Sequence, residues 1–177
     1  MAASITPLLR SERHLLTPLS IADAVEMAAV LADEELYTFT GGKPPSVAQL
    51  AARYASQTSG SGSPDEHWHN WIIRAVNAAL PLGYLQSTVT KSSADVAWVV
   101  GTRSQRTGIA SEAARAMCQW LRRCGVPRIT AHIHPEHVAS ARVAVACGLL
   151  PTAHVDNDGE QLFEWLDVDA KTTADGD

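Results

Sequence analysis

Residues 95–124, DVAWVVGTRSQRTGIASEAARAMCQWLRRC, organise the rest of this chain. The apolar run from Val96 to Val100 predicts a strand, the next residues predict a polar turn, and the apolar residues after Gly108 recur at helical spacing. A loop that leaves a strand and opens a helix directs backbone N–H groups and the positive end of the helix dipole outward. Arg103 and Arg106 add two cations to this loop. The stretch therefore predicts a binding site for a pyrophosphate.

The composition is that of an ordinary globular domain. With 177 residues, 46% of them hydrophobic and 19% charged, the chain is long enough for one domain with a sizeable core. The formal net charge of -5 argues against a nucleic-acid-binding surface, which usually carries a basic excess. No apolar run approaches the ~20 residues of a membrane span, and no signal-peptide core is present. Three cysteines without a C-x-x-C pair indicate reduced thiols. We therefore expect a cytoplasmic protein without nucleic-acid or membrane partners.

The chain before residue 95 predicts a leader, two helices and an antiparallel meander. Residues 1–12 are expected to form a flexible leader, and the Gly- and Ser-rich residues 58–64 a flexible connector. Paired glycines and prolines prevent regular structure between the two helices. The residue patterns predict strands over 14–19, 68–76, 82–90 and 95–101, and helices over 21–31 and 47–56.

The chain after residue 108 predicts a crossover and a closing hairpin. The helix that opens at Gly108 carries an apolar stripe and ends at Gly125. A strand that follows such a helix is reached by a right-handed crossover and lies parallel to the first strand. The remaining patterns predict a strand over 128–134, a helix over 136–147, hairpin strands over 149–155 and 161–166, and a disordered tail over 169–177.

Two motifs in this region resemble those of a known family. The strand VAWVV leading into QRTGIA, residues 105–110, resembles the acetyl-CoA signature Q/R-x-x-G-x-G/A of the GCN5-related N-acetyltransferases, the GNAT family. Downstream, HPEHVAS at 134–140 with CGL at 147–149 is similar to the family's Pro-x-Asn-x-x-Ser followed by Gly-Phe. The strand that begins with Asp95 most resembles the branch of the family that acetylates ribosomal-protein N-termini and many small amines. The resemblance covers about residues 15–165.

The resemblance implies a single α/β (α+β) domain over residues 13–168. In this fold a mixed, mostly antiparallel sheet of six to seven strands is splayed in the middle and flanked by about four helices. Acetyl-CoA is the implied cofactor, held by backbone groups at the splay and by the loop that opens the helix. The implied cofactor-binding residues are Trp98, Val99, Val100, Arg103, Gln105, Arg106, Thr107, Gly108, Ile109, Ala110, Ser111, His137 and Ser140.

Two positions depart from the family's motifs. His137 stands where the family most often has Asn, so an imidazole must replace the amide contact to the cofactor, or that contact is lost. Arg106 stands at a loop position that is often Gly, and it could contact a phosphate. Neither change removes backbone N–H donors, so we expect cofactor binding to be retained.

Acetyl transfer from a thioester to an amine requires a neutral amine, donors for the oxyanion and a proton for the departing thiolate. By resemblance, Ser140 is the candidate that hydrogen-bonds or protonates the sulfur. Asp95 and His134 are both candidates for the base, and the ordinary imidazole pKa of about 6.5 suits that role. Tyr84 and Glu164 are weaker alternatives.

Acceptor selection is expected in the loop between the first two helices. The candidate acceptor-binding residues are Glu34, Tyr37 and Phe39 from that loop and Tyr84 from the meander. The expected acceptor is a primary amine of a small molecule or a peptide N-terminus. We expect the enzyme to be a monomer or a homodimer.

Two other functions remain open at this point. A non-catalytic acyl-CoA-binding or sensing domain would explain the missing Asn and the two competing bases. A metal-dependent hydrolase would use His132, His134 and His137, because residues 132 and 134 share one face of a strand. No acidic or cysteine ligand lies at the usual spacing nearby, so we expect no metal.

Overall fold

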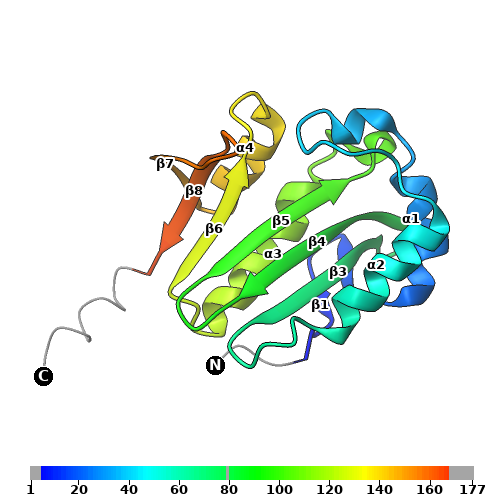
Figure 1. The fold of residues 1–177 in the computed structure, drawn as a ribbon, viewed down its shortest axis with the longest axis horizontal. Coiled ribbons are helices and arrows are strands. Elements are labelled where there is room, and N and C mark those ends of the chain that lie inside the picture. The colour runs from blue at the N-terminus through cyan, green and yellow to red at the C-terminus, as the bar shows by residue number, and fades with distance from the viewer. Residues whose placement is uncertain (1–4, 79, 168–177) are drawn as a thin grey trace, which may run out of the picture.

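The computed structural model describes residues 5–78 and 80–167, which form one eight-stranded sheet (Figure 1). The strands are β1 (Leu9–Arg10), β2 (His14–Pro18), β3 (His67–Ala75), β4 (Pro81–Val89), β5 (Ala94–Val100), β6 (Arg128–Ile133), β7 (Leu150–Val155) and β8 (Gln161–Leu166). Their order is β1-β2-β3-β4-β5-β6-β8-β7, and every pair except β5 with β6 is antiparallel. The mixed, mostly antiparallel sheet that the sequence predicts is confirmed.

Helices cover both faces of this sheet. They are α1 (Ala24–Val30), α2 (Val47–Ser59), α3 (Ile109–Arg123) and α4 (Val138–Ala146), with the short 3-10 turns η1 (Ile21–Asp23), η2 (Glu34–Tyr37) and η3 (Thr102–Ser104). α1 and α2 lie on one face and α3 on the other (Figure 1). Neighbouring residues of β3 serve the two layers, because Trp71 packs in the core under α3 and Ile72 in the core under α1 and α2.

The two parallel strands, β5 and β6, pair only near their beginnings. Ala94 pairs with Ile129 and Asp95 with Thr130, after which the strands diverge (Figure 1). β5 keeps its ladder with β4 through Val100, so the sheet opens only on the β6 side of β5. The expected splay is therefore present, and its open end lies at the C-terminal ends of both strands.

A glycine allows β5 to stay close to β4 beside this opening. Gly83 of β4 pairs with Val100, and a Cβ added at Gly83 would lie 2.1 Å from the carbonyl oxygen of Val99. No side chain fits in that space without moving the backbone of β5. Glycine is therefore required at this position by the close approach of the two strands.

The prediction of a flexible leader over residues 1–12 is wrong for residues 7–12. Leu9 and Arg10 form β1 along β2, and the carbonyl oxygen of Pro7 accepts the indole N–H of Trp71 at 2.7 Å. The Trp71 side chain is fully buried, so its N–H needs a protein partner, and this segment supplies one. β1 is also the reason that the sheet has eight strands rather than six to seven.

Some predicted element ends move by a few residues. The helix predicted over 21–31 begins as η1 before it continues as α1, and α2 runs on to Ser59. Ser46 begins α2 through a capping box with Gln49. The tail predicted over 169–177 lies outside the described residues. Among the helices described, none combines the length and the apolar character needed to cross a membrane.

Candidate functional site

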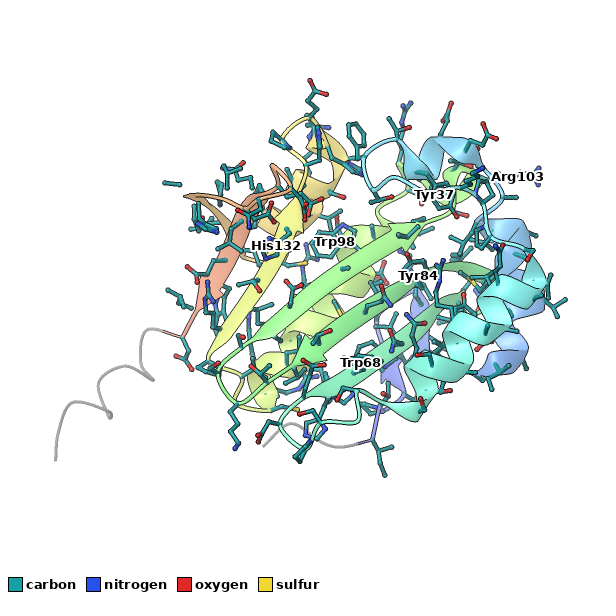
Figure 2. All side chains as sticks on the ribbon, in the orientation of Figure 1. Tyr37, Trp68, Tyr84, Trp98, Arg103 and His132 are labelled. Atoms are coloured by element: carbon teal, nitrogen blue, oxygen red, sulfur yellow. The ribbon has the colours of Figure 1, made fainter. Side chains whose placement is uncertain are left out.

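The opening between β5 and β6 brings side chains of three strands onto one face of the sheet. The register of β5 and β6, continued past its last pair, puts His132 opposite Ala97. Val99 lies on the same face as Ala97, and its β4 partner Tyr84 packs beside it under α1 and α2. Trp98 points to the other face, toward the core under α3. Figure 2 labels His132 and Trp98 on the two sides of the opening.

The loop that joins β5 to α3 is held in an unusual backbone conformation. The Gln105 side-chain amide donates to the carbonyl oxygen of Val100 at 3.1 Å, and the Thr107 hydroxyl donates to that of Ser104 at 2.7 Å. Arg106 has φ +62° and Gly108 has φ +83°. A non-glycine residue in the left-handed region costs about 1–2 kcal/mol, so the surrounding loop must enforce the conformation of Arg106.

The backbone N–H groups of residues 106–111 have no hydrogen-bond partner within the described structure. Gly108 occupies the N-cap position of α3 and brings no side chain that could accept from them. The first buried residue of the helix, Ile109, packs into the core, while Ala110 and Ser111 complete the first turn. Unpaired N–H groups at the positive end of a helix form a binding site for an anion.

Glu112 ties this helix to the N-terminal strands. Its carboxylate accepts hydrogen bonds of 2.7 Å from the Ser11 hydroxyl, the Arg13 backbone N–H and the Arg13 guanidinium. Burial alone would raise the pKa of Glu112, but these hydrogen bonds outweigh burial and lower it to about 2. The charge of Glu112 is therefore compensated by Arg13 and does not act as a free negative charge beside the anion site.

The beginning of α4 faces the opening from the β6 side. His137 is its N-cap, and its Nδ1 accepts the backbone N–H of Ser140 at 3.3 Å. The Ser140 hydroxyl lies 3.4 Å from Nε2 of the same ring. Phe39 contacts the rings of His137 and His134, with centroid separations of 4.5 and 5.3 Å. The structure thus gathers four of the predicted site residues, from two distant segments, at one place.

The hydrogen bonds of the three histidines distinguish their possible roles. Nδ1 of His134 and Nδ1 of His137 each accept a backbone N–H, so in the neutral ring each carries its hydrogen on Nε2. Nδ1 of His132 lies 2.8 Å from Oδ2 of Asp156, which can only accept. The hydrogen of neutral His132 is therefore on Nδ1, and its Nε2 keeps a lone pair for a proton. Burial lowers the pKa of His137 and favours its neutral form.

Asp95 lies at the closed end of the opening. Its carboxylate accepts from the Thr130 hydroxyl at 3.1 Å, on the last residue pair that joins β5 to β6. Although the residue is exposed in part, the burial of its carboxyl group raises the pKa of Asp95. The hydrogen bond from Thr130 opposes this shift.

The predicted acceptor residues are divided between two places. Glu34 is exposed in η2, while Phe39 joins the histidines at the beginning of α4. The Tyr37 hydroxyl donates to the carbonyl oxygen of Leu31 at 3.0 Å. Tyr84 lies on the sheet under α2, where burial raises its pKa. Arg103 lies at the outer side of the loop (Figure 2). It is close enough to Asp33 to contribute to the lowered pKa of that carboxyl group.

The three histidines do not form the cluster of potential metal ligands that the described residues contain. His132 lies with Asp156 and Glu160 of the β7–β8 turn, and their ligand atoms are within 4.8 Å of one another. Asp156 and Glu160 lie far from these histidines in the sequence, and therefore outside the usual ligand spacing. In Asp156, Oδ2 pairs with His132 and Oδ1 accepts the backbone N–H groups of Asp158 and Glu160. This arrangement suits an oriented imidazole better than a metal ligand set.

No local pattern in the sequence indicates the pair of His132 and Asp156. Asp156 reads as a residue of a hairpin turn, and it lies 24 positions from His132. Only the pairing of β6 with β8, and of β8 with β7, brings the turn to the end of β6.

Comparison with solved structures shows the fold. An acetyltransferase of the GNAT family from Bacillus anthracis has a TM-score of 0.78 at 16% identity, with 90% of this chain and 98% of that chain covered. Mycobacterium smegmatis RimJ in complex with CoA-disulfide has a TM-score of 0.77 at 17% identity, with 94% and 90% covered. RimL, a ribosomal L7/L12 alpha-N-protein acetyltransferase in complex with coenzyme A, has a TM-score of 0.74 at 15% identity, with 90% and 98% covered.

Comparison of the sequence identifies the family. No significant match is found among curated proteins. Residues 13–150, more than half of the chain, match the acetyltransferase (GNAT) domain. The match includes both motifs, the splayed strands and the loop with unpaired N–H groups. The chain belongs to the GNAT family, whose members are acetyl-CoA-dependent acyltransferases.

Proposed function

We propose that this enzyme transfers an acetyl group from acetyl-CoA directly to a primary amine. The observation that carries the proposal is the opening between β5 and β6, with the unpaired N–H groups of residues 106–111 at its mouth. These donors and the positive end of α3 fit a pyrophosphate. Beyond Asp95, the β6-facing backbone of β5 has no strand partner, which fits the pantetheine arm. Acetyl-CoA would supply the activated acetyl group at this opening.

His132 is the base in this proposal. Its Nε2 has the free lone pair, and its position opposite Ala97 puts it across the opening from the β5 backbone. The Asp156 carboxylate fixes the tautomer and stabilises the imidazolium that forms when the amine loses a proton. His134 keeps its hydrogen on Nε2, and Asp95 is engaged by Thr130 at the closed end. Both are therefore less suited to accept this proton than His132.

Ser140 assists the leaving group in this proposal. Nε2–H of His137 faces the Ser140 oxygen at 3.4 Å, which leaves the hydroxyl hydrogen of Ser140 available to the sulfur of the cofactor. The amine nitrogen forms a bond to the thioester carbonyl carbon and the carbon–sulfur bond breaks. The amine proton passes to His132, and the thiolate takes up a proton through Ser140, which regains one from water.

The acceptor in this proposal is a small-molecule amine or a peptide N-terminus. The similar fold of RimL, a protein that acetylates the α-amino group of a ribosomal protein, is compatible with a peptide acceptor. The face that carries His132 and Tyr84 is covered in part by α1 and α2, so an acceptor would enter between these helices and the β7–β8 turn.

Turnover with a panel of amines tests the function. Purified protein is mixed with acetyl-CoA and amines that include peptides with free N-termini, and the released thiol is followed. We expect thiol release that depends on an amine, and an acetylated product by mass spectrometry. Tight CoA binding with no turnover on any amine would instead favour an acyl-CoA-binding or sensing domain.

A pair of histidine variants tests the base. We expect His132→Gln to lower kcat by about 100-fold, with CoA affinity unchanged. His154→Gln is the matched control, because His154 is an exposed histidine of β7, which β8 separates from β6. If both variants kept the wild-type kcat, the base would have to be sought elsewhere.

A further inference from the structure

A small cavity lies on the sheet face that carries His132, beneath α2. Its volume is 60 Å³, and it is bounded by β3 and β4 below and by α2 above. The polar residues that line it are Arg53, Tyr54, Gln57, Asn70, Tyr84 and Gln86. Asn70 and Gln86 bond to each other, since the Gln86 amide donates to the Asn70 oxygen at 2.9 Å. The reaction proposed above assigns no role to this cavity.

Tyr54 leaves a buried hydroxyl without a partner at this cavity. The residue is only 4% exposed, and its hydroxyl makes no hydrogen bond in the part of the chain that the structure describes. Burial raises the pKa of Tyr54 to about 12, so the phenol remains protonated and can donate. A buried donor that is left unpaired is unfavourable, and an acceptor atom placed in the cavity would complete its hydrogen bond.

Arg53 adds a positive charge at the same place. Its guanidinium has no ion-pair or hydrogen-bond partner among residues 5–78 and 80–167. It acts electrostatically on the hydroxyl groups of Tyr37, Tyr54 and Tyr84, so it lies near all three. The Tyr84 hydroxyl also makes no described hydrogen bond. A free cation and two phenol donors therefore converge on one small cavity.

We propose that this cavity binds a carboxylate of the acceptor, and that the enzyme prefers amines that carry one. Donors and a cation without a nearby counter-ion match an anion, and the planar guanidinium of Arg53 suits a carboxylate. This inference rests on the proposed acetyl transfer, because it extends the acceptor site from His132 to Arg53.

The strand register limits the length of such an acceptor. Tyr84 pairs with Val99, which lies two residues from Ala97, the residue opposite His132. Strand spacing and rise put Tyr84 at least about 10 Å from His132, because β5 and β6 diverge beyond Asp95. A free α-amino acid is too short to span this distance. A peptide with an acidic side chain near its N-terminus, or a long ω-amino acid, can reach both ends.

Matched acceptors test the preference and distinguish its source. The peptide probes are Ala-Ala-Glu-amide and Ala-Ala-Gln-amide, and the small-molecule probes are aminooctanoate and aminooctanamide. At saturating acetyl-CoA we expect the charged member of at least one pair to have a kcat/KM about tenfold higher than its neutral partner. A preference in the peptide pair alone would identify a peptide acceptor. Equal values in both pairs would overturn the inference.

Two variants locate the preference in the cavity. Arg53→Met should reduce the charged-to-neutral ratio of kcat/KM from about tenfold to about one, and Tyr54→Phe should reduce it by about threefold without lowering Tm. Arg10→Met is the control for net charge, because Arg10 is exposed on β1, and it should keep the wild-type ratio. A ratio unchanged in Arg53→Met would overturn the inference even if the wild type prefers charged acceptors.

A binding experiment separates this inference from the proposed reaction. The Tm of the CoA complex is measured with and without the Glu and Gln peptides. If no amine is turned over, the proposed reaction fails, yet a Tm increase with the Glu peptide that Arg53→Met abolishes would still support a carboxylate site. Active enzyme with no difference between the two peptides, in Tm or in rate, would leave the reaction standing and refute the carboxylate site.

Discussion

The beginnings of α3 and α4 face the same opening but satisfy their backbone in opposite ways. α3 begins at Gly108, and the N–H groups of residues 106–111 have no partner in the described structure. α4 begins at His137, whose own side chain accepts the N–H of Ser140. The difference indicates a division of roles. In the proposed function, one helix keeps its donors for a ligand, while the other uses a side chain to hold a serine in place.

The largest expected effect comes from closing the uncapped beginning of α3. A β-branched residue at φ +83° forces the loop to change, so Gly108→Val should weaken CoA binding about 1,000-fold, or by ~4 kcal/mol. Several hydrogen bonds to charged oxygens, each of about 1.5–3 kcal/mol, would be lost. Titration calorimetry with CoA measures the change.

Gly125 provides the matched control for this variant. It follows the other end of α3 with φ +77°, and a Cβ there would meet no atom within 4 Å. Gly125→Val should therefore introduce similar backbone strain, about 1–2 kcal/mol of stability, and leave CoA binding intact. Equal loss of CoA binding in both variants would mean that strain in the helix, rather than the donors at its beginning, explains the result.

The second prediction concerns the acid in the first turn of α3, which has no counterpart in α4. The pKa of Glu112 is lowered from about 4.5 to about 2 in the folded state. Its contribution to folding stability is therefore fully present above the pKa of the unfolded chain and is lost as the pH falls toward 2. The shift corresponds to about 3 kcal/mol. Glu112→Gln should lose about this much unfolding free energy at pH 6 and less at pH 3. Urea unfolding at both pH values measures it, and an equal difference at both would contradict the prediction.

The third prediction concerns the serine that α4 holds in place. Ser140→Ala should lower kcat about tenfold, or by ~1.4 kcal/mol, because the departing thiolate loses a donor. The affinity for CoA should change less than threefold, since the donors of α3 are untouched. Steady-state kinetics and calorimetry give the two values. Equal losses in both would move Ser140 from the reaction to cofactor binding.

The smallest expected effect tests the cap of α4. His137→Asn keeps an acceptor for the Ser140 N–H, whereas His137→Ala removes it and should lower stability by about 1 kcal/mol. The Asn variant should keep stability within about 0.5 kcal/mol and retain more activity than the Ala variant. Thermal unfolding and kcat measured on the pair test this. If both variants behaved alike, the cap would have no role in positioning Ser140.

Much of the fold and one half of the site follow from local sequence. The apolar strand before residue 101, Gly108 and the apolar stripe of α3 predict a strand, a loop and a helix, and the structure contains them. The loop conformation follows because glycine is the residue that readily takes a left-handed φ. The two motifs also predict that Ser140 lies near the beginning of a helix, and it lies in the first turn of α4.

The other half of the site depends on contacts that local sequence does not encode. His132 and Asp156 meet only because β8 lies between β6 and β7 in the sheet. Arg53 and Tyr84 line one cavity only because α2 packs against β3, the neighbour of β4 in the sheet. The prediction of a flexible leader is wrong for the same reason, since the order of this segment depends on the indole of Trp71 and on Glu112, both far along the chain.

Gly83 touches neither cofactor nor acceptor in these proposals, yet its lack of a side chain determines how far β5 lies from β6. Since a methyl group there would push against the Val99 carbonyl, even alanine would displace β5 sideways toward β6. The gap that must admit a thioester would narrow, although every residue lining it stayed the same. Substrate fit in this enzyme can thus be altered from a neighbouring strand, by a change that a survey of contact residues alone would overlook.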